Sequence, residues 1–221
     1  AIWRRMVAGA GAHGLVVGVD VPAPEMDPYS PAIASNVGVR LACDSGAGDA
    51  EVVIKTDIDC WITSDGFQQM AQVERGRAVF PVIRFATAWG EWGTARIDYA
   101  PCGTAALTVQ DWYLMQGYDE RMTGHGKEDG DLYERALRAG IRADRPQDMV
   151  YHVAHPDRRG ARYPVRRIEN CLIARWNDWH NERWGLPGDT EEGGEGRERG
   201  KKAETPQTRL YGALGRAGTG G

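Results

Sequence analysis

Two aspartates on alternate positions, Asp57 and Asp59, follow an apolar run in the segment Glu51–Thr63. In a strand, residues i and i+2 point to the same side, so we expect both carboxylates to converge at the carboxyl end of that strand, where open α/β sheets bind ligands. Carboxylate oxygens suit Mg²⁺ or Mn²⁺ bridging a diphosphate. The pair predicts a metal-bound phosphate site, although an ordinary junction between a strand and a turn carries the same pattern.

A second group of carboxylates follows a glycine-rich stretch. The segment Gly124–Leu132 reads G-H-G-K-E-D-G-D-L and carries Glu128, Asp129 and Asp131. Acidic residues in the first turn of a helix complement the helix dipole, which accounts for one or two of them. Three carboxylates behind a G-H-G-K lead-in also suit a site that holds a general base and binds sugar hydroxyls. This helix start is therefore the second candidate for chemistry.

Two histidines late in the chain are candidate metal ligands. The segment Asp148–Pro156 alternates apolar and polar residues, as a strand does, and carries His152 and His155. A histidine at a strand end more often serves as a structural hydrogen-bonding group. Here, however, the aspartate pair offers too few ligands to fix a divalent ion alone, and an imidazole can complete the coordination. Both histidines stay open as candidates.

The elements that must position these residues follow from apolar spacing. Ser30 and Pro31 open a helix, because serine caps helix N-termini and proline is tolerated in the first turn. A strand before it and a strand after it, Gly14–Asp20 and Glu51–Lys55, give a β-α-β order, for which parallel strands are expected. The other predicted elements are strands at Ala78–Ala86 and Cys102–Thr108 and helices at Asp65–Arg75, Val109–Met115 and Ile168–Leu186, with a further helix ending at Gly140.

Length and composition bound the function. A chain of 221 residues that is 42% hydrophobic can bury one sizeable core, so we expect one catalytic domain over residues 1–186. Residues 187–221 are dominated by glycine and charge and are expected to be a disordered tail. The net charge of −4 argues against a general nucleic-acid binder, because the one short arginine cluster spans residues 158–167. No apolar run reaches the length of about 20 residues that a membrane span needs.

The cysteines and tryptophans add two expectations. Four widely spaced cysteines without a C-x-x-C pair favour reduced thiols over a disulfide framework or a zinc site, which suits a cytoplasmic chain. Three tryptophans of the last predicted helix are expected to pack on the domain, because core packing is their commoner use. They are Trp176, Trp179 and Trp184.

These motifs, in this order, resemble inverting glycosyltransferases of the GT-A fold, especially the galactosyltransferase and N-acetylgalactosaminyltransferase branch and its bacterial polysaccharide relatives. Asn36-Val37-Gly38 matches the N-x-G element of that branch, and Asp57-Ile58-Asp59 its D-x-D. Cys102–Leu107 matches its small-residue strand, while Gly117–Glu120 and Gly124–Leu132 match its hallmark G-[FY]-D-E and G-W-G-G-E-D-x-D segments. The resemblance spans about residues 14–156. It implies an α/β GT-A fold, Rossmann-like, with a mixed sheet flanked by helices and with the first strand lacking from an N-terminally incomplete domain.

The resemblance also implies a donor and a metal. Asp59, helped by Asp57, would bind Mn²⁺ or Mg²⁺ on the diphosphate of a nucleotide sugar, expected to be a UDP-sugar. His152 would be the distal metal ligand, with His155 as the alternative. Two further residues, Asn36 and Gly103, would line the donor site.

For the reaction itself, the resemblance implies that Asp129 takes the proton from an acceptor hydroxyl, with Glu128 beside it. Two residues would contact the acceptor, a glycan or glycoconjugate: Asp131 and His125, the latter replacing a tryptophan of the family. Lys127 replaces a glycine and adds a charge that could meet an acidic acceptor or a phosphate. Two other classes stay open, a metal-dependent phosphate-ester hydrolase and an inactive remnant that binds a sugar nucleotide or a glycan.

Overall fold

A computed structural model describes residues 16–19, 30–44, 48–49, 51–57, 59–86, 96–98, 100–101, 103–124, 126–153, 167–176, 178–186 and 208–211. The strands are β1 (Val16–Val19), β2 (Val52–Thr56), β3 (Cys60–Ile62), β4 (Arg77–Val79), β5 (Ile83–Ala86), β6 (Arg96–Asp98), β7 (Thr104–Thr108), β8 (Arg142–Asp144), β9 (Val150–Val153) and β10 (Thr208–Tyr211). The helices are α2 (Pro31–Asp44), α3 (Ser64–Met70), α4 (Val109–Met115), α5 (Glu128–Arg138) and α7 (Arg167–Trp176).

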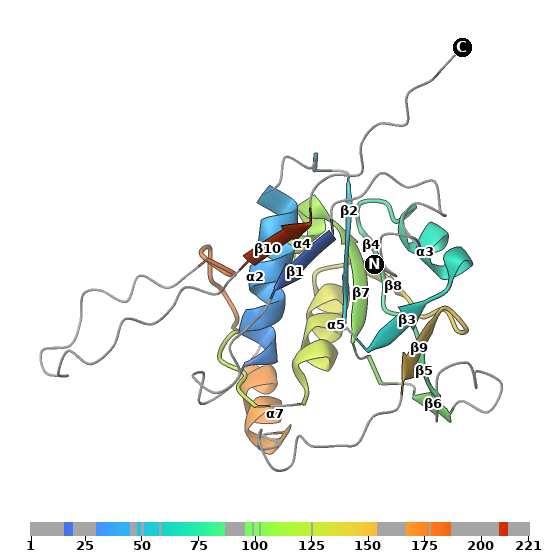
Figure 1. Ribbon diagram of the computed structural model, residues 1–221. Helices are drawn as coiled ribbons and strands as arrows, with labels where there is room; N and C mark the ends of the chain where they lie inside the picture. The colour runs from blue at the N-terminus through green and yellow to red at the C-terminus, as the bar shows by residue number, and fades with distance from the viewer. Residues whose placement is uncertain are drawn as a thin grey trace, which may run out of the picture.

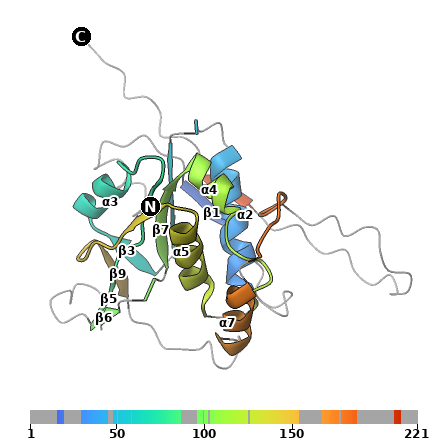
Figure 2. The same ribbon diagram turned by 180° about the vertical axis from the view of Figure 1, so that it is seen from behind.

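The strands form one two-stranded and two four-stranded sheets. The orders are β1-β10, β2-β7-β4-β8 and β3-β9-β5-β6. Each four-stranded sheet is mixed, with one parallel pair, β4 with β8 and β5 with β9. Figures 1 and 2 show α2, α4 and α5 gathered on one side of β2 and β7, with α3 on the other and α7 near one end of α2 and α5. The predicted α/β class with a mixed sheet flanked by helices is confirmed.

Two apolar clusters hold this arrangement. One lies between the helices α2, α4 and α5 and the sheet that contains β7, and includes the fully buried Trp112, Leu132 and Leu107. The other lies among β3, α3, β5 and β9 and includes Ile62, Met70 and Val150. Since β7 contributes Leu107 to the first cluster and Ala106 to the second, it is buried on both faces.

The predicted parallel β-α-β unit is wrong. β1 pairs with β10, and β2 pairs antiparallel with β7, in a register that sets Thr56 opposite Thr104. The predicted order of strand, helix and strand along the chain is present, but the strand that pairs with β2 lies about 50 residues downstream. Local spacing in the sequence does not reveal such a partner. This pairing matters because it sets the end of β2, just before Asp57, beside the start of β7.

Other elements differ in length. The strand predicted at Ala78–Ala86 is two strands in different sheets, because Pro81 has no amide hydrogen to donate within a ladder. The last predicted helix ends at Trp176, whose side chain is exposed, whereas Trp184 is buried and Trp179 packs on the core. Within the expected tail, β10 is a strand, and the remainder lies outside the described residues.

Candidate active site

Gly103, directly before β7, joins the two carboxylate motifs. Its carbonyl accepts a hydrogen bond from the Asp57 amide (2.9 Å), and its own amide donates to Asp129 Oδ2 (3.0 Å). Its φ of +67° suits glycine, and a Cβ there would lie 3.1 Å from Asp57 Oδ2 and 3.2 Å from Cys60 Sγ. The backbone at Gly103 therefore holds the D-x-D segment and the start of α5 against each other.

Asp129 is fixed by three neighbours. Besides the Gly103 amide, the Tyr118 hydroxyl donates to Asp129 Oδ1 (3.1 Å), and Lys55 Nζ lies 3.8 Å from the same oxygen. The side chain keeps 18% of its surface exposed, so it is partly reachable from solvent. A carboxylate held in this way has a defined direction and can accept a proton from a hydroxyl that binds next to it.

Lys55, which is positively charged, and Tyr118 lie together next to Asp129. Lys55 Nζ donates to Asp57 Oδ1 (2.7 Å) and lies 5.5 Å from the centre of the Tyr118 ring. Burial opposes the ammonium charge, but nearby negative charges, among them those of Asp129 and Asp57, outweigh burial and hold the pKa of Lys55 above its ordinary value. Burial raises the pKa of Tyr118 well above its usual range, so its hydroxyl stays a donor at neutral pH. Lys55 therefore carries the positive charge between the two aspartates.

Glu128 adjoins Asp129 and is buried. The Gly126 amide donates to Glu128 Oε2 (2.9 Å). Burial, and next the negative charge of Asp129, raise the pKa of Glu128 from 4.5 to about 7. Neutral and ionised forms therefore coexist near pH 7, and the Glu128 carboxyl can act as either a donor or an acceptor toward a bound hydroxyl.

Asp59 and His152 form the second part of the site. β2 ends at Thr56, so Asp59 lies in the turn before β3 rather than in one strand with Asp57. Cys60 pairs with His152 across β3 and β9, which brings Asp59 Oδ2 within 3.3 Å of His152 Nε2. The Phe85 ring packs 4.7 Å from the imidazole, centre to centre. Asp57 and Asp59 thus meet different partners, Lys55 of β2 and His152 of β9.

These donors fit one edge of a divalent-ion site. Two atoms bound at right angles to one ion, each about 2.1 Å from it, lie about 3 Å apart, close to the spacing of Asp59 Oδ2 and His152 Nε2. A carboxylate oxygen and an imidazole nitrogen suit Mn²⁺. In the described parts of the chain, no cluster of three or more acidic, histidine or cysteine ligands occurs. His155 and His125 lie outside the described residues.

Asn36 has a structural role inside the fold. Its side chain is fully buried, accepts from the Tyr118 amide (2.7 Å) and donates to the Tyr118 carbonyl (2.9 Å) and to Glu120 Oε1 (2.9 Å). A Cβ on Gly117 would lie 2.3 Å from Asn36 Oδ1. The N-x-G asparagine therefore holds the Gly117–Glu120 segment, and through it Tyr118, instead of facing the expected donor site.

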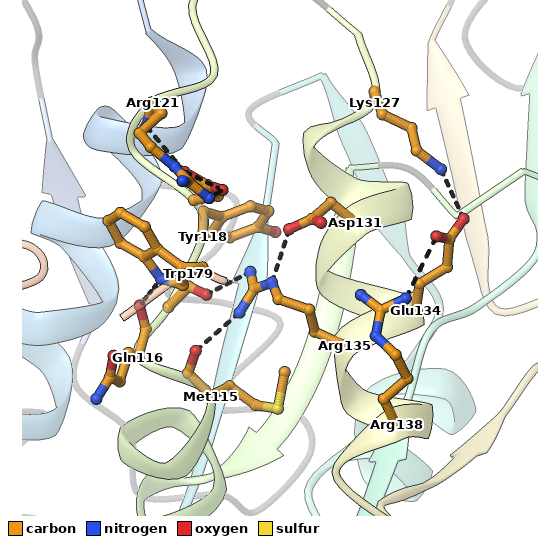
Figure 3. A network of polar contacts seen from close by, with 12 residues as sticks. Met115, Gln116, Tyr118, Arg121, Lys127, Asp131, Glu134, Arg135, Arg138 and Trp179 are labelled. Atoms are coloured by element: carbon orange, nitrogen blue, oxygen red, sulfur yellow. Dashed lines mark hydrogen bonds and ion pairs between the residues drawn. The ribbon is translucent and has the colours of Figure 1, made fainter. Parts of the chain in front are cut away.

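Asp131 is also inside the fold. Its carboxylate is buried and pairs with Arg135 Nε (2.7 Å), whose two other nitrogens donate to the carbonyls of Met115 and Gly117 (2.8 Å each). Figure 3 shows Arg135 bridging from Asp131 to the end of α4. Burial raises the pKa of Asp131, against the effect of Arg135. Asp131 therefore positions the Gly117 corner and does not present a free carboxylate to an acceptor.

Comparisons with known proteins support the fold. Residues 89–157, less than a third of the chain, match a family model described as the N-terminal domain of galactosyltransferase. The catalytic domain of Drosophila β1,4-galactosyltransferase 7, solved with xylobiose, aligns with a TM-score of 0.54 at 16% identity over 81% of this chain and 73% of that one. The fold is that of a galactosyltransferase catalytic domain.

A second solved structure gives the same result for the galactosyltransferase-like fold. A mutant of the Drosophila enzyme, in complex with manganese, UDP-Gal and xylobiose, aligns with a TM-score of 0.50 at 15% identity, covering 86% of this chain and 73% of that one. No curated protein matches the sequence. None of the described helices is long and apolar enough to cross a membrane.

Sequence reasoning missed Lys55, Tyr118 and Arg135 as parts of the candidate site. Lys55 was detectable, because a lysine inside an apolar strand and two residues before Asp57 points to the same side as that aspartate. Arg135 was detectable as the i+4 partner of Asp131 on a helix. Tyr118 carried no such signal, because its contact with Asp129 depends on how the Gly117 corner folds.

Proposed function

We propose that this chain is a metal-dependent glycosyltransferase that moves a hexose or N-acetylhexosamine from a nucleotide-diphosphate donor to a glycan hydroxyl, with inversion at the anomeric carbon. The observation that carries the proposal is the junction at Gly103, which fixes Asp129 beside the D-x-D segment. The galactosyltransferase-like fold, and the UDP-Gal, manganese and xylobiose bound by a solved protein of that fold, support the choice of reaction.

Asp129 is the general base in this proposal. The acceptor oxygen attacks the anomeric carbon, the bond from that carbon to the diphosphate oxygen breaks with its electron pair, and the hydroxyl proton passes to the Asp129 carboxylate. Tyr118 and the Gly103 amide hold the carboxylate in one orientation, which lowers the entropic cost of proton transfer. Glu128, poised between its two protonation states near pH 7, holds a second hydroxyl of the bound sugar.

Asp59 and His152 would hold the divalent ion, with Asp57 next to them. When bound, such an ion offsets the negative charge that grows on the leaving diphosphate. Lys55 lies between Asp57 and Asp129, and its positive charge offsets the repulsion between the two carboxylates. Asn36 and Asp131 serve as positioning residues for the Tyr118 segment.

Calorimetric titration with UDP, with and without Mn²⁺, tests the donor site. UDP should bind to the chain more tightly with Mn²⁺, and Asp59→Ala should remove that dependence, while Asp65→Ala, at an exposed aspartate in α3, should not. Failure of Mn²⁺ to affect UDP binding to the folded chain would refute the proposed metal and donor.

Transfer assays separate the classes of function. With UDP-galactose as the first donor tried, Asp129→Asn should abolish transfer to a saccharide acceptor while UDP binding persists. If the chain releases free sugar from the donor, and adding an acceptor does not reduce this release, the hydrolase is favoured instead. If the chain binds UDP but neither transfers nor hydrolyses any of the donors tried with any acceptor, the inactive remnant is favoured.

A further inference from the structure

A charged cleft lies between α5 and α7, on another side of α5 from the Asp131–Arg135 pair. It is open to solvent, has a volume of about 570 Å³, which is in the range of small-ligand sites, and is lined by Lys127, Glu134, Arg138, Cys171, Ala174 and Arg175. Figure 3 shows Lys127, Glu134 and Arg138 together along this side of the helix. Three cationic side chains thus face a single carboxylate.

The cations are only partly neutralised. Glu134 is shared, with Lys127 Nζ at 2.6 Å from one of its oxygens and Arg138 at 3.8 Å from the other. Among the residues that the structure describes, Arg175 has no ion-pair partner. The cleft therefore has a surplus of positive charge and can take an anionic group without first breaking an ion pair at Arg175.

Lys127 occupies a backbone position that glycine would take without strain. Its φ is +84°, its ψ is −20°, and its side chain makes no capping hydrogen bond to α5. Lysine at this position therefore does not stabilise the start of α5. Residues with a strained backbone of this kind are most often found at functional sites. The Lys127 side chain runs along α5 over Gly130 and places its ammonium in the cleft.

The cleft is also tied to the candidate active site. Asn170 of α7 donates to the carbonyls of Gly126 (2.7 Å) and Thr123 (3.2 Å), in the loop that leads to Glu128 and Asp129. The same helix therefore supports the catalytic loop and forms one wall of the cleft. Asp129 and Glu134, the partner of Lys127, leave α5 about 140° apart around its axis, so the catalytic position and the cleft are neighbouring but separate.

We propose that the α5–α7 cleft is an acceptor subsite for an anionic group, a carboxylate or a phosphate, on a sugar residue other than the one attacked. This inference rests on the proposed transferase function. The acceptor is then an acidic saccharide, with its charged residue in the cleft and its reacting hydroxyl at Asp129.

Cys171 reports on occupancy of the cleft. It is a partly exposed free thiol, whereas Cys43 and Cys60 are buried, so its alkylation by iodoacetamide can be followed by peptide mass spectrometry. Methyl β-glucuronide should slow this alkylation, and methyl β-glucoside, which differs by its lack of the carboxylate, should not. Glucose 6-phosphate in a parallel arm distinguishes a phosphate preference from a carboxylate preference.

Variants test which charges matter. Lys127→Gly, which also relieves backbone strain, and Arg175→Gln should each weaken the protection by the preferred anionic sugar about fivefold, as expected for one partly exposed charge contact. Arg142→Gln, at an exposed arginine of β8, should leave it unchanged. The subsite would be overturned if methyl β-glucoside protected Cys171 as well as the anionic sugars do. It would also be overturned if Cys171 were protected in the Lys127→Gly and Arg175→Gln variants as well as in the parent chain.

Titration with the donor nucleotide distinguishes an acceptor subsite from a donor site. UDP with Mn²⁺ should not protect Cys171, and protection by UDP would overturn the acceptor assignment because the cleft would then hold the donor diphosphate. UDP binding that depends on Mn²⁺, combined with no protection by either anionic sugar, would refute the subsite alone. Protection by an anionic sugar in a chain that binds no UDP would refute the transferase, and with it the acceptor role of the cleft.

Discussion

Replacement of Asn36 by alanine should destabilise the chain strongly, although no substrate need touch this residue. Its fully buried amide satisfies both the amide and the carbonyl of Tyr118 and also donates to Glu120. Leaving buried backbone groups without partners costs about 1–3 kcal/mol each, so we expect Asn36→Ala to lose about 3–4 kcal/mol of unfolding free energy. For a chain of this size that corresponds to a fall in Tm of roughly 6–16 °C.

Urea unfolding followed by circular dichroism measures this loss, with Gln72→Ala at an exposed position as the control. A more specific comparison is Asn36→Asp, which keeps the acceptor for the Tyr118 amide but sets a second negative oxygen against the Tyr118 carbonyl and Glu120. The pKa of the new carboxyl should be raised in the folded state, so its stability deficit should be smaller at pH 5 than at pH 8. A loss below about 1 kcal/mol for Asn36→Ala, or an Asn36→Asp deficit that does not change with pH, would refute the assigned role.

Three further outcomes are expected. Gly117→Ala should prevent folding or cost more than about 3 kcal/mol because its Cβ would overlap Asn36 and Trp184, whereas Gly140→Ala, with a positive φ but open space, should cost only about 1–2 kcal/mol by urea unfolding. Because the folded pKa of Glu128 is raised to about 7, its burial destabilises the fold as pH rises from about 4.5 to 7, and Glu128→Gln should flatten the fall in stability over that window in a pH series of thermal melts. Burial raises the pKa of Cys43 to about 12, so iodoacetamide at pH 8 should modify Cys171 long before Cys43, and equal rates in the folded chain would contradict the described packing.

Local signals in the sequence predicted the start of α2, both bounds of α4 and the end of α5, whereas the helix predicted at Asp65–Arg75 is the shorter α3 (Ser64–Met70). The Ser30 hydroxyl accepts from the Ile33 amide (3.2 Å), as expected of a helix cap, and Gly140, with φ of +80°, follows the end of α5. α4 has the predicted bounds, Val109–Met115. These features depend on residues within one turn of each other, and short-range spacing is enough to find them.

Strand pairing could not be predicted in the same way. The partner of β2 is β7, and the partner of β3 is β9, so the site is assembled from segments far apart in the chain. Alternation of apolar residues defines which face of a strand is buried but not which strand lies next to it. The meeting of Asp57 with Asp129 through Gly103, and of Asp59 with His152, is therefore a result of the fold.

The carboxylates of the hallmark segment are not equivalent, and their spacing explains why. Asp129 and Asp131 lie two residues apart on α5, about 200° around the helix, so they cannot face the same ligand. Asp129 faces Lys55, Gly103 and Tyr118, whereas Asp131 faces Arg135 inside the protein. Loss of activity on replacing Asp131 would thus mean a displaced Gly117 corner, and only a change in activity at unchanged stability, as expected for Asp129→Asn, indicates a group that acts on the substrate.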